Sequence, residues 1–213
     1  MNDLLSYWNA HLTEIVGWAG TTIWLAGLPL AGGLLVGLPL GLLATRSIGW
    51  NAALIGASNI VYTVPSLVMF LVLPEVLGTG ILAPVNVAVA LTIYTASLAT
   101  RSVRDGLDAV SPSTLAAAEA IGHTPWQVMW KVRLPLAVPV IAAGVRVAAV
   151  ANVSLVSVAS VIGTAQLGQL FVAGNNTGAL TPIILGLTLF FMLAMAMDGV
   201  VVLLARLLTP WAR

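Results

Sequence analysis

The chain has 213 residues, of which 60% are hydrophobic and only 7% are charged, and its formal net charge is +1. A soluble domain carries roughly 25% charged residues, so this composition excludes an ordinary soluble fold and favours an integral membrane protein. The chain has no cysteine, which excludes disulfides and thiol catalysis. The eight basic residues form no patch that would bind nucleic acid, and two histidines far apart predict no metal site.

Apolar segments recur along the chain, and a helix needs about 20 such residues to cross a bilayer. We expect five spans, at residues 15–44, 53–73, 81–100, 136–162 and 180–208. The borders near 51–54 and 77–83 are indistinct, and residues 163–179 fit either an external or a re-entrant loop. The first 14 residues lack a basic residue, so we expect the first apolar segment to be retained rather than cleaved. The sequence thus predicts one all-α polytopic domain over residues 1–213.

The charges are sorted between the predicted loops. Seven of the eight basic residues fall on one side of a five-span layout, and the eighth, Arg146, lies within a span. The other side holds Asp3, Glu14 and Glu75, with no Lys or Arg. Because basic residues are retained on the cytoplasmic side, we predict an external N-terminus and a cytoplasmic C-terminus.

Residues 101–135, between the third and fourth spans, form the one long polar segment and hold seven of the fifteen formal charges. Ser111 followed by Pro112 predicts a helix start, and Gly122 a left-handed stop. Thr124 and Pro125 repeat the start signal, and we expect a second helix that continues over residues 126–134 to Pro135 and runs into the fourth span. From spacing alone, a compact knob facing the cytoplasm and a helix lying on lipid headgroups are about equally good interpretations.

The spacing of AAAEAIG (residues 116–122) and VRLP (132–135) resembles the cytoplasmic signature of ABC importer permeases, E-A-A-x-x-x-G-(nine residues)-I-x-L-P. The signature's glutamate is absent, and Ala116 stands in its place. The stretches VPSL (64–67), GHTPW (122–126), LPLAVP (134–139), AGVR (143–146) and GTAQLGQL (163–170) are similar to the subfamily that imports glycine betaine, carnitine, choline and related osmoprotectants.

The resemblance implies a prokaryotic cytoplasmic-membrane permease that pairs with a second permease subunit, identical or paralogous, and receives solute from an extracytoplasmic binding protein. Separate ATPase subunits would grip the short cytoplasmic helix and hydrolyse ATP, since this chain has no phosphate-binding G-x-x-x-x-G-K-[ST] sequence. It implies neither an enzyme nor a cofactor. The implied ATPase-coupling residues are Ala116, Ala117, Ala118, Glu119, Gly122, His123, Thr124, Pro125, Leu134 and Pro135.

Polar residues inside the predicted spans are the other candidates for function. Arg146 and Asp198 lie at similar depth, so we expect them to pair, as either a static ion pair or a mobile latch. Candidates for lining the solute pathway are Tyr62, Pro65, Ser66, Asn152 and Ser157. Two alternatives to an osmoprotectant permease stay open: a methionine-type or other amino-acid importer permease, and a membrane scaffold that does not transport.

Overall fold

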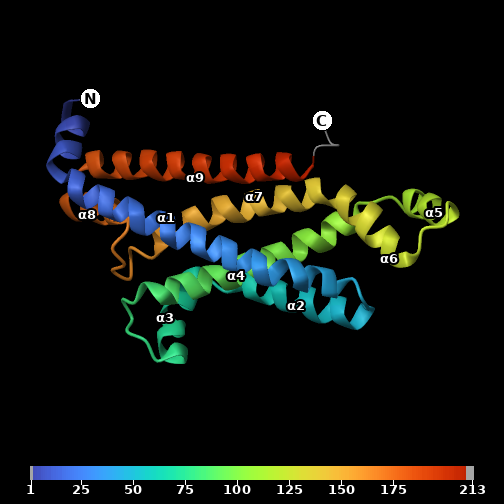
Figure 1. The fold of residues 1–213 in the computed structure, drawn as a ribbon. Coiled ribbons are helices and arrows are strands. Elements are labelled where there is room, and N and C mark those ends of the chain that lie inside the picture. Colours follow the sequence, from blue (N-terminus) through green and yellow to red (C-terminus); the bar gives the residue numbers. More distant parts are fainter. Residues whose placement is uncertain (1, 210–213) are drawn as a thin grey trace.

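Helices make up most of residues 2–209, the part of the chain that the computed structural model describes (Figure 1). An all-α protein is therefore confirmed over that part. The helices are α1 (Asn2–Ala44), α2 (Ile48–Thr63), α3 (Ser66–Leu77), α4 (Pro84–Asp108), α5 (Pro112–Ala120), α6 (Pro125–Gln127), the π-helical η1 (Val128–Arg133), α7 (Leu134–Val158), α8 (Gln169–Thr177) and α9 (Leu180–Leu208).

The expected spans differ from the observed helices in several places. α9 has the expected bounds, but α1 begins at Asn2 and kinks at His11, whose φ of −118° and ψ of 15° are not helical. The second span is two helices, α2 and α3, that meet at Pro65 and are bent by 105°. α4 runs past residue 100 to Asp108, and α7 ends at Val158 rather than at 162. Residues 163–179 include helix α8.

Within the described residues, three helical stretches are long and apolar enough to cross a membrane, and the count is four if the bent pair α2–α3 is one span. α4 does not meet the same criterion, although it covers the expected third span. It lies among α1, α2 and α7 and buries Asn86, Thr95, Ser97 and Thr100. A helix whose neighbours are protein can carry polar side chains that lipid would exclude, so hydropathy alone understates α4. The five-span count stays a prediction.

Glycines bring α1 and α4 into backbone contact. Gly33, Gly37 and Gly41 lie one turn apart on α1 and face α4. A Cβ atom at Gly37 would lie 2.5 Å from the carbonyl oxygen of Ala96, and the hydroxyl of Thr100 donates to the carbonyl of Gly37 at 3.3 Å. Small residues at this spacing allow helices to approach closely in a membrane, so the stripe fixes the position of α4.

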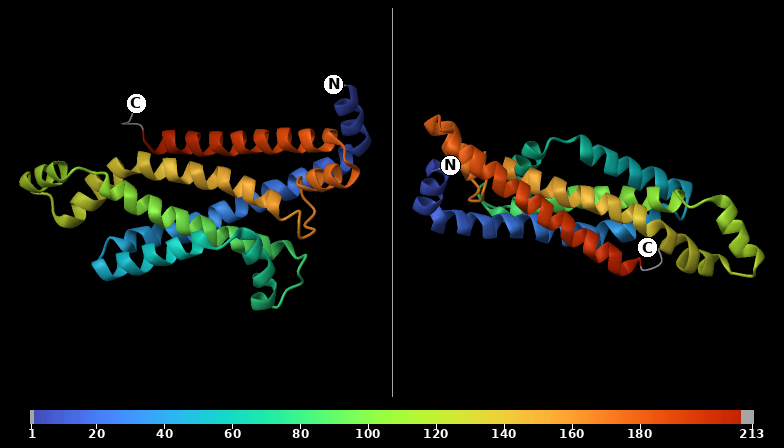
Figure 2. Two further views of the ribbon diagram at one scale, coloured as in Figure 1. Left: turned by 180° about the vertical axis from the view of Figure 1, so that it is seen from behind. Right: turned by 90° about the horizontal axis from the view of Figure 1, so that it is seen from above.

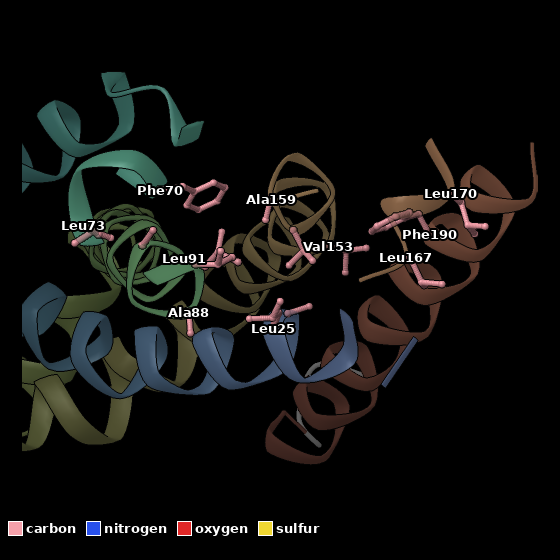
Figure 3. Close-up of a cluster of buried hydrophobic side chains, with 14 of the residues drawn as sticks. Leu25, Phe70, Leu73, Ala88, Leu91, Val153, Ala159, Leu167, Leu170 and Phe190 are labelled. Carbon is pink, nitrogen blue, oxygen red and sulfur yellow. The ribbon is translucent and has the colours of Figure 1, made fainter. Parts of the chain in front are cut away.

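The main hydrophobic core gathers side chains from α1, α3, α4, α7, α8 and α9 (Figure 3). Leu25, Phe70, Leu91, Val153 and Leu170 are among its buried members. A second, smaller cluster joins the end of α4 to the start of α7 through Val103, Leu107, Val110, Ala137 and Ile141. Leu115 of α5 and Met129 of η1 pack against this second cluster.

The connections lie at two opposite ends of the bundle (Figures 1 and 2). The α1–α2 connection, α5, α6 and the end of α9 are at one end, and the start of α1, α3 and α8 are at the other. Arg46, Lys131 and Arg206 are in or beside segments at the first end. The basic residues that the sequence assigned to one side of the membrane therefore lie at one end of the bundle. Arg213, which was also assigned to that side, lies outside the described residues.

Candidate functional site

The polar segment folds as a short helix with defined ends. The side-chain oxygen of Ser111 accepts a hydrogen bond from the Thr114 N–H at 3.2 Å, and Pro112 occupies the first turn of α5. At the other end, Gly122 has φ +91°. The N–H groups of Gly122 and His123 donate to the carbonyls of Glu119 and Ala118, at 2.9 and 3.2 Å. This pair of bonds is the Schellman arrangement, and it requires the left-handed residue at Gly122.

The second start signal forms a capping box. Thr124 accepts from the N–H of Gln127, and the Gln127 side chain accepts from the N–H of Thr124. The helix then passes through the π-helical turn η1 directly into α7, which confirms the prediction that it runs into the fourth apolar segment. Proline lacks an N–H and its ring crowds the preceding turn. The widened turn before Pro135 accommodates both effects and keeps the helix continuous.

The predicted coupling residues are distributed over two faces of this segment. Ala116, Ala117 and Glu119 are exposed on α5, whereas Ala118 is only 6% exposed and packs inward. Thr124 and Pro125 are also exposed, and His123, Leu134 and Pro135 are half-buried. Two large apolar side chains next to the exposed alanines, Ile121 and Trp126, are 76% and 71% exposed. The segment thus presents an apolar surface with small residues at its centre.

An arginine that the sequence reasoning did not single out joins the base of this segment to α4. Arg133 donates through Nε to the carbonyl of Leu107 at 3.0 Å, and its Nη2 lies 3.3 Å from Oδ1 of Asp108. Asp108 also pairs with Arg104 at 3.0 Å. The opposite charges of Asp108 and Arg133 could have suggested this contact, but the two residues are too far apart in the sequence for local spacing to predict it. These contacts attach the base of the segment to the end of α4.

A cavity of about 330 Å³ lies where α2 and α3 meet, beside α4 and α7. Its lining consists of Tyr62, Val64, Pro65, Ser66, Tyr94, Ala151, Ser154 and Leu155. Three of the predicted pathway residues, Tyr62, Pro65 and Ser66, are therefore brought together here. Tyr94 and Ser154 complete it, and none of these lining residues carries a formal charge. The rings of Tyr62 and Tyr94 meet edge to face, with centroids 6.3 Å apart.

The other two predicted pathway residues do not line this cavity. Asn152 is only 2% exposed and lies between α7, α4 and α1, where its amide nitrogen donates to Thr95 Oγ1 at 2.9 Å and to the carbonyl of Ala26 at 3.4 Å. Asn152 therefore links three helices and does not reach this cavity. Ser157 is half-buried, and its hydroxyl donates to the carbonyl of Ser154 in its own helix. Ser154, one turn earlier, is the α7 serine that reaches the cavity.

Arg146 of α7 and Asp198 of α9 form an ion pair. Nε and Nη2 of Arg146 donate to the two carboxylate oxygens of Asp198 at 2.6 and 2.8 Å. Such parallel bonds fix both side chains. The pair is partly exposed on the surface of the bundle and lies outside the cavity lining, so its geometry joins two helices rather than two sides of a pathway.

The molecule is a helical bundle with one broken helix, an open cavity and a polar segment that projects from one end, an architecture that fits a membrane transport subunit. Residues 37–210 match the family described as "Binding-protein-dependent transport system inner membrane component", and the chain belongs to that family. It is a permease subunit of an ABC importer.

Curated relatives resemble the chain over most of its length. The osmoprotectant import permease protein OsmW of Salmonella typhimurium is 31% identical, with 88% of each chain covered. The glycine betaine/carnitine/choline transport system permease protein OpuCB of Bacillus subtilis is 30% identical, covering 99% of this chain and 95% of the relative.

Solved structures share the fold. One described as an amino acid ABC transporter with histidines has a TM-score of 0.81 at 23% identity, covering 95% of this chain and 97% of that one. An inward-facing MetNI methionine ABC transporter has a TM-score of 0.79 at 23% identity, with 94% and 98% covered. At this identity the likeness describes the fold alone.

Proposed function

We propose that this permease forms the translocation pathway of an ATP-driven importer for an osmoprotectant or another quaternary amine. The observation that carries the proposal is that the chemistry of the cavity lining suits the solutes for which the relatives are named. The relatives named for osmoprotectant, betaine, carnitine and choline transport match nearly the whole chain, and the cavity has tyrosine rings and no charged lining residue. Aromatic faces attract quaternary ammonium groups.

The coupling role of residues 101–135 is part of the proposal. Partner ATPase subunits would dock on α5 through the exposed Ala116 and Ala117, with Ile121 and Trp126 beside them. The exposure of this apolar surface and the bonds of Arg133 support a rigid lever. A second permease subunit would complete the pathway, and an extracytoplasmic binding protein would deliver the solute at the opposite end of the bundle.

The distribution of Lys and Arg between the loops supports five crossings with α5 in the cytoplasm, and the family supports the cytoplasmic membrane of a prokaryote. A reporter fused after residue 209 and another placed within residues 175–178 should report opposite sides of the membrane. Reports from the same side would contradict this orientation.

The amino-acid alternative rests on the fold of the solved neighbours. An amino-acid solute brings a primary ammonium, whose three N–H donors need acceptors, whereas a quaternary ammonium donates no hydrogen bond. The uncharged cavity lining favours the quaternary amine over this alternative.

Uptake into cells that lack their own osmoprotectant transport tests the proposal. The permease is expressed with its ATPase and binding protein, and labelled glycine betaine, choline, carnitine and methionine are offered separately. We expect uptake of one or more quaternary amines and none of methionine. An ATPase variant that cannot hydrolyse ATP provides the control and should abolish uptake. Methionine uptake would favour the alternative, and no uptake of any solute would favour a non-transporting scaffold.

A further inference from the structure

At the helix break around Pro65, the backbone groups that leave the regular helical pattern have other hydrogen-bond partners. The N–H of Val68, which would bond to Val64 in a continuous helix, donates instead to the carbonyl of Pro65 at 3.0 Å. The freed carbonyl of Val64 accepts a hydrogen bond from the hydroxyl of Tyr94 on α4. The polar end of Tyr94 is thus occupied, and its ring remains as an apolar wall of the cavity.

A second ring stands against this wall. Tyr62 lies on α2 just before the break, and its ring plane makes an angle of 84° with that of Tyr94. Tyr94 is 5% exposed and held in place, whereas Tyr62 is 45% exposed. The two rings therefore form a corner with one fixed and one accessible side. On the other walls, Ser66 and Ser154 supply hydroxyl groups.

We propose that the corner of Tyr62 and Tyr94 is the subsite that receives the trimethylammonium headgroup of the transported solute, while Ser66 and Ser154 face its oxygen-bearing tail. This inference rests on the proposed function and assigns parts of the solute to parts of the cavity. A cavity of about 330 Å³ is at the lower end of the roughly 300–1,000 Å³ of small-molecule sites, which suits a small solute.

The chemistry of the lining favours a quaternary over a primary ammonium group. A primary ammonium has three N–H donors that need acceptors, and the carbonyl at this corner already uses one of its two lone pairs for Tyr94. No described residue of the lining offers a carboxylate. The nearest cation along α4, Arg101, is bonded to Asn59 at 2.8 Å. A trimethylammonium group donates no hydrogen bond and needs only the electron-rich ring faces.

The absence of cysteine from the chain allows a direct test. Ser154→Cys places a single thiol of nearly the same shape in the cavity wall, and Thr188→Cys places a control thiol on an exposed part of α9. The complex with ATPase and binding protein is reconstituted in vesicles, and the rate at which a membrane-permeant maleimide labels this subunit is measured. Choline is compared with 3,3-dimethylbutan-1-ol, which has the same shape without the charge.

Choline should slow the labelling at position 154 and not at 188, and the neutral analogue should slow neither. Adding Tyr62→Phe, which keeps the ring, should preserve protection. Adding Tyr62→Leu should raise the half-protecting choline concentration about two- to thirty-fold, as expected for the loss of one cation–π contact.

Equal protection by the neutral analogue, or an unchanged choline concentration with Tyr62→Leu, would overturn the subsite. So would unprotected labelling at position 154 in a complex that transports choline, and in that case the proposed function would stand. A complex that transports no quaternary amine would instead contradict the proposed function. If Tyr62→Leu fails to insert, the comparison of choline with its neutral analogue in the Tyr62 background still decides.

Discussion

Replacing Gly122 by valine should separate solute transport from folding. Gly122 has φ +91°, and no atom lies within 4 Å of the position that a Cβ atom would take. The cost of a side chain is therefore conformational rather than steric. A left-handed residue with a Cβ costs roughly 1–2 kcal/mol, which changes the balance between the turn and a continued helix by a factor of about 5–30.

The consequence of that shift is a change in direction of α5. If the helix continues through residue 122, the bonds from Gly122 and His123 to Glu119 and Ala118 are lost. The exposed alanines then no longer face the ATPase, while the hydrophobic core at the opposite end of the bundle keeps its contacts. We expect normal membrane insertion, reduced solute uptake and weaker co-purification of the ATPase subunit, all measured on the same membranes.

Two variants serve as controls. Gly78→Val imposes a similar backbone penalty at φ +65° with no atom within 4 Å, but at the end of α3, so ATPase association should be unchanged. Gly122→Asn should retain more function than the valine variant, because asparagine tolerates the left-handed conformation. Full uptake and full ATPase association with Gly122→Val would refute the reasoning and leave α5 as a helix lying on lipid headgroups.

Three further predictions concern contacts between helices. Gly37→Leu should lower the melting temperature in detergent and the yield of inserted protein, because a Cβ atom at Gly37 lies 2.5 Å from the backbone of α4. Gly27→Ala, with open space around it, should lower neither. Equal yields for the two variants would contradict the α1–α4 contact. Arg133→Gln should reduce uptake more than membrane yield, with Arg133→Lys retaining part of it through Asp108; a parallel loss of both quantities would point to a purely structural role. Arg146→Met and Asp198→Asn should each lower thermal stability, and the double variant should lose less than the sum of the two; additive losses would show that the pair is not coupled.

The proposed coupling segment could be predicted in detail because its structure depends on local chemistry. Ser111, Pro112, Gly122 and Thr124 each act on backbone groups within a few residues, and the structure has the corresponding caps and the left-handed turn. The continuation of the second helix into the fourth apolar segment was also predicted, but the π turn before Pro135 was not.

The candidate cavity could be predicted only in part. Tyr62, Pro65 and Ser66 were predicted for the pathway, but the 105° bend between α2 and α3 and the position of Tyr94 beside it were not. Asn152 and Ser154 are both polar residues of α7, and the sequence reasoning placed only the first in the pathway. The structure buries Asn152 against α1 and α4 and places Ser154 in the cavity wall, a difference in rotation about the helix axis.

The sequence by itself determined three properties: an all-helical membrane protein, the gathering of basic residues at one end, and the fold of residues 111–127. Composition and charge are averages over the chain, and helix capping depends on a few neighbouring residues, so none of the three needs the tertiary structure. Only the tertiary structure decided which face of each helix meets another helix. In a soluble protein the apolar face identifies the core, but here lipid and protein interior are both apolar, so hydrophobicity carries little information about rotation. The glycine stripe facing α4, the bond from Arg133 to Leu107 and the corner of Tyr62 and Tyr94 all depend on that rotation.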